Sequence, residues 1–97
     1  MNVEYHPSLA GDLSVARDFY NERSPGLGDQ FVNEFETQVL RIAARPERWM
    51  VVRDDVRRAL MRRFPYSIFF RILDGDSIRI TVIKHHRQHP GFGIGRN

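Results

Sequence analysis

The sequence contains no cysteine among its 97 residues, so it can form neither disulfides nor thiolate metal sites. This absence is typical of a protein from a reducing compartment, and we expect the chain in the cytoplasm. No apolar run approaches the roughly 20 residues that a membrane-spanning helix needs. The first residues also lack a basic segment followed by an apolar one. The sequence therefore predicts a protein that neither enters a membrane nor is exported.

Several catalytic and ligand-binding motifs are absent as well. Three glycines occur within residues 91–97, but no helix follows them, so they do not form a phosphate-binding loop. The serines lie in contexts typical of caps, breaks or strands, which leaves no candidate catalytic triad. A metal site made of His85, His86 and His89 is disfavoured by their spacing and cationic neighbours. We predict no metal and no cofactor.

Acidic residues are scarce in the second half of the chain. Residues 1–45 contain seven acidic residues and four arginines, whereas residues 46–97 contain five acidic residues, ten arginines and one lysine. Guanidinium groups bind phosphate and carboxylate groups bidentately, so the second half suits a partner rich in either group. A solvated basic surface without a partner is the alternative.

Three β-rich runs follow one another in the second half. Residues 66–73 (YSIFFRIL) and 77–84 (SIRITVIK) are separated by Asp-Gly-Asp, a strong signal for a β-hairpin. Pro65 cannot donate to a strand ladder, so residues 56–63 are expected to form a separate strand. The pattern predicts a three-stranded antiparallel meander.

Strict alternation assigns the side chains of this hairpin to two faces. The face expected to be buried carries Tyr66, Ile68, Phe70, Ile72, Ile78, Ile80 and Val82. The other face carries Ser67, Phe69, Arg71, Leu73, Arg79, Thr81 and Ile83. This second face is too apolar for water and too charged for a core, so we expect another element or partner to cover it part of the time.

The first 46 residues predict one strand and two helices. Residues 2–6 alternate apolar and polar side chains and stop at a proline, which indicates a short edge strand. Ser8 is a candidate N-cap for a first helix that ends before Pro25. A second helix is expected over about residues 27–44, ended by Pro46.

Both helices show apolar stripes at helical spacing. The expected stripe residues are Leu9, Leu13, Val15, Ala16, Phe19 and Tyr20 on the first helix and Phe31, Phe35, Val39 and Ile42 on the second. An antiparallel helix hairpin on a small, mainly antiparallel sheet gives a two-layer α+β fold in the order β-α-α-β-β-β. We expect one domain over residues 1–97, with residues 91–97 a flexible tail and Trp49 covering the edge of the core.

Basic residues gather where the predicted strands meet. Arg62 and Arg63 lie on one predicted strand, Arg71 lies on the next, and residues 84–89 (KHHRQH) leave the last. Phosphodiester cleavage needs cations around the phosphate and a group that titrates near neutrality, which arginine and histidine supply. A basic sheet edge with solvated histidines is the alternative.

Four stretches taken together resemble the RelE/ParE superfamily of bacterial type II toxins. They are the helix break RSPGLGDQF, the helix end ARPERW, the strand pair VRRALMRRFPYSIFFRI and the exit VIKHHRQHP, and the resemblance covers residues 3–90. It implies a small cytoplasmic protein of the α+β fold described above, encoded beside an antitoxin that binds and neutralises it. Relatives of RelE cut mRNA in the ribosome, and relatives of ParE poison DNA gyrase.

One position favours the ParE branch. In the ribonuclease branch an arginine commonly follows the tyrosine that opens the middle strand, whereas Ser67 follows Tyr66 here. Against this, Arg87 matches the basic residue that leaves the last strand of the ribonucleases, and His85 and His86 resemble the terminal histidines of some of them. We therefore expect a gyrase inhibitor without chemistry of its own, with a ribosome-dependent mRNA endoribonuclease using His85, His86 and Arg87 as the alternative.

The candidate residues form two sets. Those expected to bind the target, gyrase or the ribosome, are Arg62, Arg63, Lys84, His85, His86 and Arg87. Those expected to bind an acidic amphipathic segment of the antitoxin are Phe69, Arg71, Arg79 and Ile83. Direct sequence-specific DNA binding is not expected, because neither predicted helix is basic.

Overall fold

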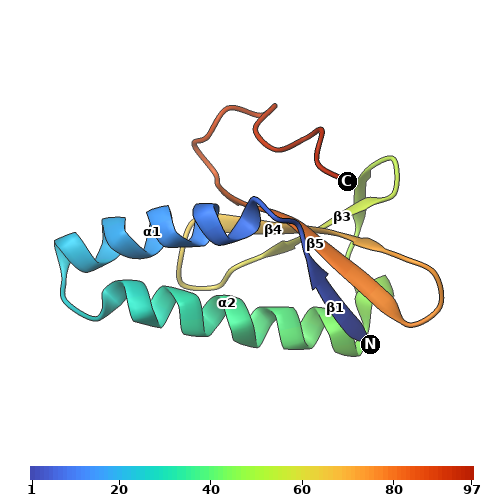
Figure 1. Cartoon of the computed structure of the whole chain (residues 1–97), viewed down its shortest axis with the longest axis horizontal. Coiled ribbons are helices and arrows are strands. Elements are labelled where there is room, and N and C mark those ends of the chain that lie inside the picture. Colours follow the sequence, from blue (N-terminus) through green and yellow to red (C-terminus); the bar gives the residue numbers. More distant parts are fainter.

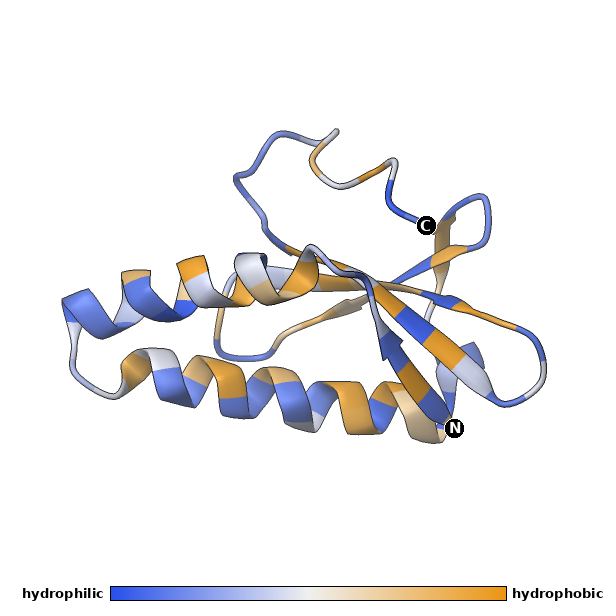
Figure 2. Ribbon diagram, viewed as in Figure 1, coloured by the Kyte–Doolittle hydropathy of each residue, from blue (hydrophilic) through white to orange (hydrophobic).

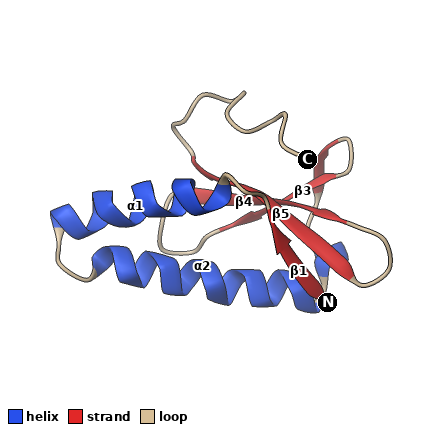
Figure 3. Ribbon diagram, viewed as in Figure 1, coloured by secondary structure: helices blue, strands red, loops and turns tan.

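The computed structural model describes residues 1–97 and has two layers, a helix pair and a sheet (Figures 1 and 3). In chain order the elements are β1 (Asn2–Tyr5), α1 (Leu9–Arg23), α2 (Leu27–Ala44), the single 3₁₀ turn η1 (Pro46–Arg48), β2 (Val51–Arg53), β3 (Val56–Leu60), β4 (Tyr66–Ile72) and β5 (Ser77–His85). The predicted two-layer α+β fold is confirmed. Neither helix is long and apolar enough to cross a bilayer.

The sheet has five strands in the order β1-β5-β4-β3-β2. The predicted edge strand β1 pairs with β5 in parallel, and the other neighbours are antiparallel. Strand β2 was not predicted. It has three residues and pairs irregularly with β3, so it is too short to produce a recognisable alternation.

The predicted β4–β5 hairpin is confirmed. Gly75 in its turn has φ +65°, which glycine adopts without a steric penalty, and Leu73 N–H donates to the Ser77 carbonyl at 2.8 Å. Strand β3 is shorter than predicted and ends at Leu60. The chain then forms a loop over residues 61–65, because two of its backbone N–H groups bond to Glu34 on α2 and not to a strand.

A β-bulge on β5 changes which side chains face the helices. Phe69 pairs with Val82 and Phe70 with Ile80, so Thr81 has no partner in the ladder. Beyond the bulge Ile83 points into the core and is only 2% exposed. The predicted places of Val82 and Ile83 were therefore wrong, since strict alternation assumes an unbroken strand. The alternation of apolar and polar residues along β5 can be followed in Figure 2.

The core lies between α2 and the central strands. The predicted stripe of α2 is confirmed, since Phe31, Phe35, Val39 and Ile42 are all buried. On α1 the stripe is narrower than predicted, because Val15 is 72% and Phe19 45% exposed. These two side chains therefore lie outside the core, and Phe19 contacts Tyr20 and Arg23 of its own helix.

Aromatic rings join the helix pair to the sheet. Phe31 packs edge-on against Tyr66 with a centroid distance of 4.8 Å and against Phe64 at 5.1 Å. Tyr20 of α1 contacts the same group, lying 5.0 Å from Phe64. Trp49 packs edge-on against the buried Phe70 at 6.4 Å, at the edge of the core where it was expected.

Candidate functional site

The structure gathers most of the predicted target-binding residues at one end of the sheet. We call this end the basic edge; it comprises Arg62 and Arg63 of the β3–β4 loop and residues 85–87, at and just beyond the end of β5. The loop and the strand exit are joined by a hydrogen bond of 2.9 Å from His86 N–H to the Pro65 carbonyl. Arg71 does not belong to this edge. It pairs with Arg79, at the opposite end of β4 from the strand exit.

Glu34 of α2 holds the arginine loop in place. Its carboxylate accepts the backbone N–H groups of Arg62 at 2.9 Å and Arg63 at 3.1 Å. The Arg63 guanidinium also donates to the Gln30 side-chain oxygen at 3.0 Å. The loop is therefore bonded to the helix on one side and to the strand exit on the other, so the basic edge has a defined shape.

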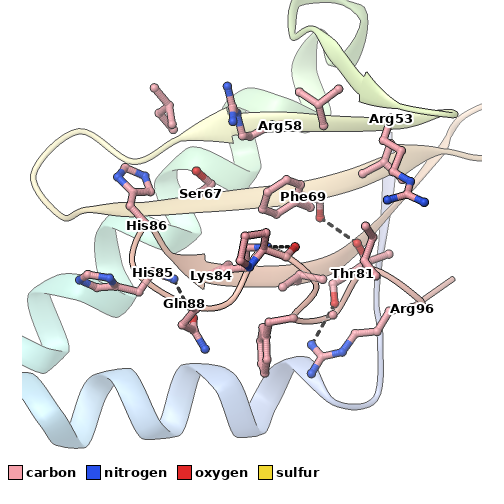
Figure 4. A pocket seen from close by; sticks show the side chains of 18 of the residues that line it. Arg53, Arg58, Ser67, Phe69, Thr81, Lys84, His85, His86, Gln88 and Arg96 are labelled. Atoms are coloured by element: carbon pink, nitrogen blue, oxygen red, sulfur yellow. Dashed lines mark hydrogen bonds between the residues drawn. The ribbon is translucent and has the colours of Figure 1, made fainter.

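The two histidines at the strand exit have different surroundings, although they are neighbours in sequence. His85 packs edge-on against Tyr66 at 5.0 Å, and its Nδ1 accepts the Arg87 backbone N–H at 2.9 Å. Burial, with the positive charges of His86 and Arg87 adding to it, lowers the pKa of His85 below its ordinary value. His86 is exposed and lies beside Ser67, on the face of the sheet away from the helices (Figure 4).

Lys84 belongs to the open face of the sheet more than to the basic edge. Its ammonium donates to the Pro90 carbonyl at 2.7 Å and lies 5.4 Å from the centre of the Phe69 ring. Burial lowers the pKa of Lys84 below its ordinary value. Its charge is therefore directed toward the C-terminal segment.

A cavity of about 520 Å³ lies on the open face, which is the face away from the helices (Figure 4). We call it the open-face cavity. Its apolar lining consists mainly of Leu60, Phe69, Val82, Phe92 and Ile94. Its charged lining consists of Arg53, Asp54, Arg58, Lys84 and Arg96, with Asp54 the one acidic member, and His85 and His86 complete the polar side. The cavity is thus apolar in its floor and positive around it.

The structure separates the four predicted antitoxin-binding residues. Phe69 is half-buried and lines the open-face cavity. Ile83 was placed on this face by the sequence and is instead buried in the core, and Val82 takes its place in the cavity. Arg71 and Arg79 lie side by side on the open face but outside the cavity.

Arg71 already has a partner within the chain. Its guanidinium donates to both carboxylate oxygens of Asp55, at 2.9 to 3.1 Å, and this hydrogen bonding lowers the pKa of Asp55 below its ordinary value. The Nε of Arg79 is buried without a hydrogen-bond partner. Arg79 is therefore the member of this pair that has bonding capacity to spare.

The sequence missed the contribution of the C-terminal segment to the open face. Figure 1 shows residues 90–97 on the side of the sheet away from α2. Phe92, Ile94 and Arg96 all line the cavity. Their alternation with three glycines suggested mobility, because no local signal in the sequence shows that these residues meet the sheet.

The chain is a small two-layer α+β domain with a basic edge. Residues 3–90 match the family of ParE toxins of type II toxin-antitoxin systems, parDE. A solved structure described as a chromosomal ParDE TA system from P. aeruginosa superposes with a TM-score of 0.77 at 24% sequence identity, covering 88% of this chain and 95% of that one. No curated protein matches the sequence.

Because the family match spans most of the chain, this protein belongs to the ParE toxin family. It is a ParE-like toxin of the type II toxin-antitoxin class. The branch expected from Ser67 is confirmed, and the ribonuclease alternative is not favoured.

Proposed function

We propose that this toxin acts in the cytoplasm by binding DNA gyrase and inhibiting supercoiling, without chemistry of its own. The observation that carries the proposal is the basic edge. Two hydrogen-bonded segments carry Arg62, Arg63, His86 and Arg87, and the first of these segments is also bonded to α2. A backbone already held in a defined shape costs little ordering entropy on docking, and the guanidinium groups that it carries suit an acidic protein surface.

The surroundings of His85 support binding more than catalysis. Its Nδ1 is occupied by the Arg87 backbone N–H, and its lowered pKa keeps the ring neutral at pH 7. Ser67 stands where the ribonuclease branch commonly has an arginine. These features suit a role of His85 in shaping the strand exit.

We further propose that a cognate antitoxin neutralises the toxin by covering the open face. The family is one of toxins of two-component systems, and the similar solved structure is described as such a system. Phe69 and Val82 offer an apolar floor with Arg58 and Lys84 beside it, and Arg79 offers a further positive charge on the same face outside the cavity. An acidic amphipathic segment would bury apolar side chains there and pair its carboxylates with the cations.

The test of the gyrase proposal uses purified toxin in a supercoiling assay. The wild type should inhibit gyrase. Arg87→Glu should abolish inhibition, because it reverses a charge within the basic edge. Replacing His85 and His86 together by glutamine keeps polarity and approximate size, so it should change the inhibitory concentration by only a modest factor.

The same variants are assayed on ribosome-bound mRNA. The proposal expects the mRNA to remain intact with every variant. Codon-periodic cleavage by the wild type that falls by ~10²-fold or more in the double glutamine variant would contradict the gyrase proposal and favour the endoribonuclease.

A further inference from the structure

The C-terminal segment crosses the open face without joining the sheet. We call residues 90–97 the strap. Its backbone–backbone hydrogen bonds are all local: Phe92 N–H bonds to the His89 carbonyl, Ile94 N–H to that of Gly91 and Arg96 N–H to that of Gly93. Since no strand pairing holds the strap, its position depends on side chains.

Arg96 anchors the strap at its far end. Its guanidinium forms a two-point ion pair with the carboxylate of Asp12 on α1, and Nη1 also donates to the Thr81 carbonyl at 3.2 Å. The two side chains are only 17% and 13% exposed. Ion pairs with this little access to water are screened much less than surface pairs. Thr81 is the bulge residue, so the bulge supplies the carbonyl that completes the anchor.

The middle and the near end of the strap are also fitted to the sheet. Gly93 has φ +73°, and a Cβ there would lie 2.6 Å from a methyl group of Val82. Glycine is therefore required for this close approach. At the near end the Lys84 ammonium holds the Pro90 carbonyl. The strap meets the sheet at three successive points along its length.

This arrangement makes the strap one side of the open-face cavity. Phe92 and Ile94 of the strap line the cavity together with Phe69 of β4 and Leu60 of β3. The space between them remains open, at about 520 Å³, and cationic side chains border it. An apolar side chain flanked by carboxylates matches both its lining and its charge.

We propose that the strap is a fixed wall of the docking site for an acidic, apolar-tipped segment of the antitoxin, locked by the Asp12–Arg96 pair. The inference rests on the proposed antitoxin partner. The apolar tip inserts between Phe69 and the strap, and the flanking carboxylates meet Arg58 and Lys84. Asp12 lies outside the cavity, and the Arg96 guanidinium is bonded to Asp12 and the Thr81 carbonyl, so both act as positioning residues.

A strap that is mobile, or that leaves when the antitoxin binds, predicts the opposite effect on antitoxin affinity. If the strap is the mobile tail that its glycines suggest, or if it occupies the place of the partner and must leave, loosening it would favour binding. A locked wall predicts that loosening it weakens binding, because the partner would then have to order the strap at an entropic cost.

The first measurement reports the strap itself. Backbone {¹H}-¹⁵N NOE values of Gly93 and Gly95 should approach those of the sheet in the wild type. They should fall in Arg96→Gln and in Asp12→Asn, each of which keeps approximate size and removes one charge of the lock. Asp18→Asn, an exposed position on the same helix, is the matched control and should leave them unchanged. Low NOE values of Gly93 and Gly95 in the wild type would show that the strap is mobile, which would overturn the inference.

The second measurement is calorimetric titration of the full-length toxin with the antitoxin encoded in the adjacent reading frame. Each lock variant should bind about tenfold more weakly, the double variant no more weakly than either single one, and Asp18→Asn like the wild type. Tighter binding by Arg96→Gln or Asp12→Asn would show that the strap is displaced when the antitoxin binds. Unchanged binding by a variant whose strap is loosened would show that the strap is not part of the docking site. Either result overturns the inference. A wild type that binds no antitoxin would instead overturn the proposed partner.

Discussion

Glu34 is the residue that connects α2 to the loop of the basic edge. Its carboxylate accepts two consecutive backbone N–H groups, those of Arg62 and Arg63. Paired donors of this kind are poorly satisfied in a loop that has left its strand, and a carboxylate supplies enough lone pairs for both. One acidic side chain thus positions two cationic ones without pairing with either guanidinium.

Replacing Glu34 by glutamine should lower the free energy of unfolding by about 1 to 2 kcal/mol, because a charged acceptor becomes a neutral one and one oxygen becomes a donor. Urea denaturation measures the change. Glu36→Gln is the matched control, since Glu36 is exposed on the same helix, and it should change stability little. Equal stability of the two variants would contradict the role of Glu34.

His85 should make stability depend on pH. Its pKa in the folded state lies below the ordinary value of the unfolded chain, so the unfolded state binds more protons as the pH falls below about 6.5. His85 titration therefore contributes nothing to the free energy of unfolding at pH 7.5, and it lowers that free energy toward pH 5.5. The wild type should therefore lose more stability over this range than His85→Gln. Denaturation at both pH values checks this, and parallel losses would refute it.

At the scale of elements, the contact between α1 and α2 depends on one glycine. A Cβ on Gly28 would lie 2.1 Å from the Arg17 carbonyl oxygen, and the Gly28 N–H donates to the Asn21 side chain at 2.7 Å. The two helices therefore approach with backbone against backbone. With the helices held this close, Phe31 of α2 packs against Phe64 and against Tyr66 of β4.

Gly28→Ala should destabilise the protein by at least about 2 to 3 kcal/mol, because a backbone carbonyl has to move. Gly11→Ala provides the control on α1, where a Cβ meets nothing within 4 Å. It should raise stability by about 0.5 to 1 kcal/mol through helix propensity. Thermal unfolding of both variants checks the contrast, and a similar effect of the two would contradict the close approach.

At the scale of the whole molecule, charge is distributed unevenly between the two halves of the chain. The net charge of +3 is the sum of an acidic first half and a basic second half. The first half forms the helices, and the second half forms most of the sheet. The basic edge and the open face are both built from this second half. Partners of the proposed kind are therefore attracted toward the sheet before contact.

Raising the salt concentration from about 0.05 M to 0.5 M should slow association with the antitoxin about tenfold or more, because long-range attraction is screened. The dissociation rate should change much less, since it reflects contacts already formed. Stopped-flow or surface-based kinetics measure both rates. A salt effect confined to dissociation would argue against electrostatic steering.

Much of this protein could be predicted from its sequence because the signals were local. Proline positions ended the helices where expected, the Asp-Gly turn made the hairpin, and the apolar spacing of α2 gave its buried face. The resemblance identified the family from motifs spread over residues 3–90, and the family match agrees with it. The gathering of basic residues also followed from the meander, apart from Arg71.

Other features were decided by the tertiary structure. The bulge at Thr81 exchanges the faces of Val82 and Ile83, because register depends on hydrogen bonds between strands and alternation within one strand does not record it. The Arg96–Asp12 pair joins residues 84 positions apart, and their neighbours in sequence give no sign of it. The sequence by itself determined the elements and the class of toxin, since those depend on local preferences and on the order and spacing of motifs. Only the packed structure determined which residues border the open-face cavity, because that depends on contacts between segments distant in the chain.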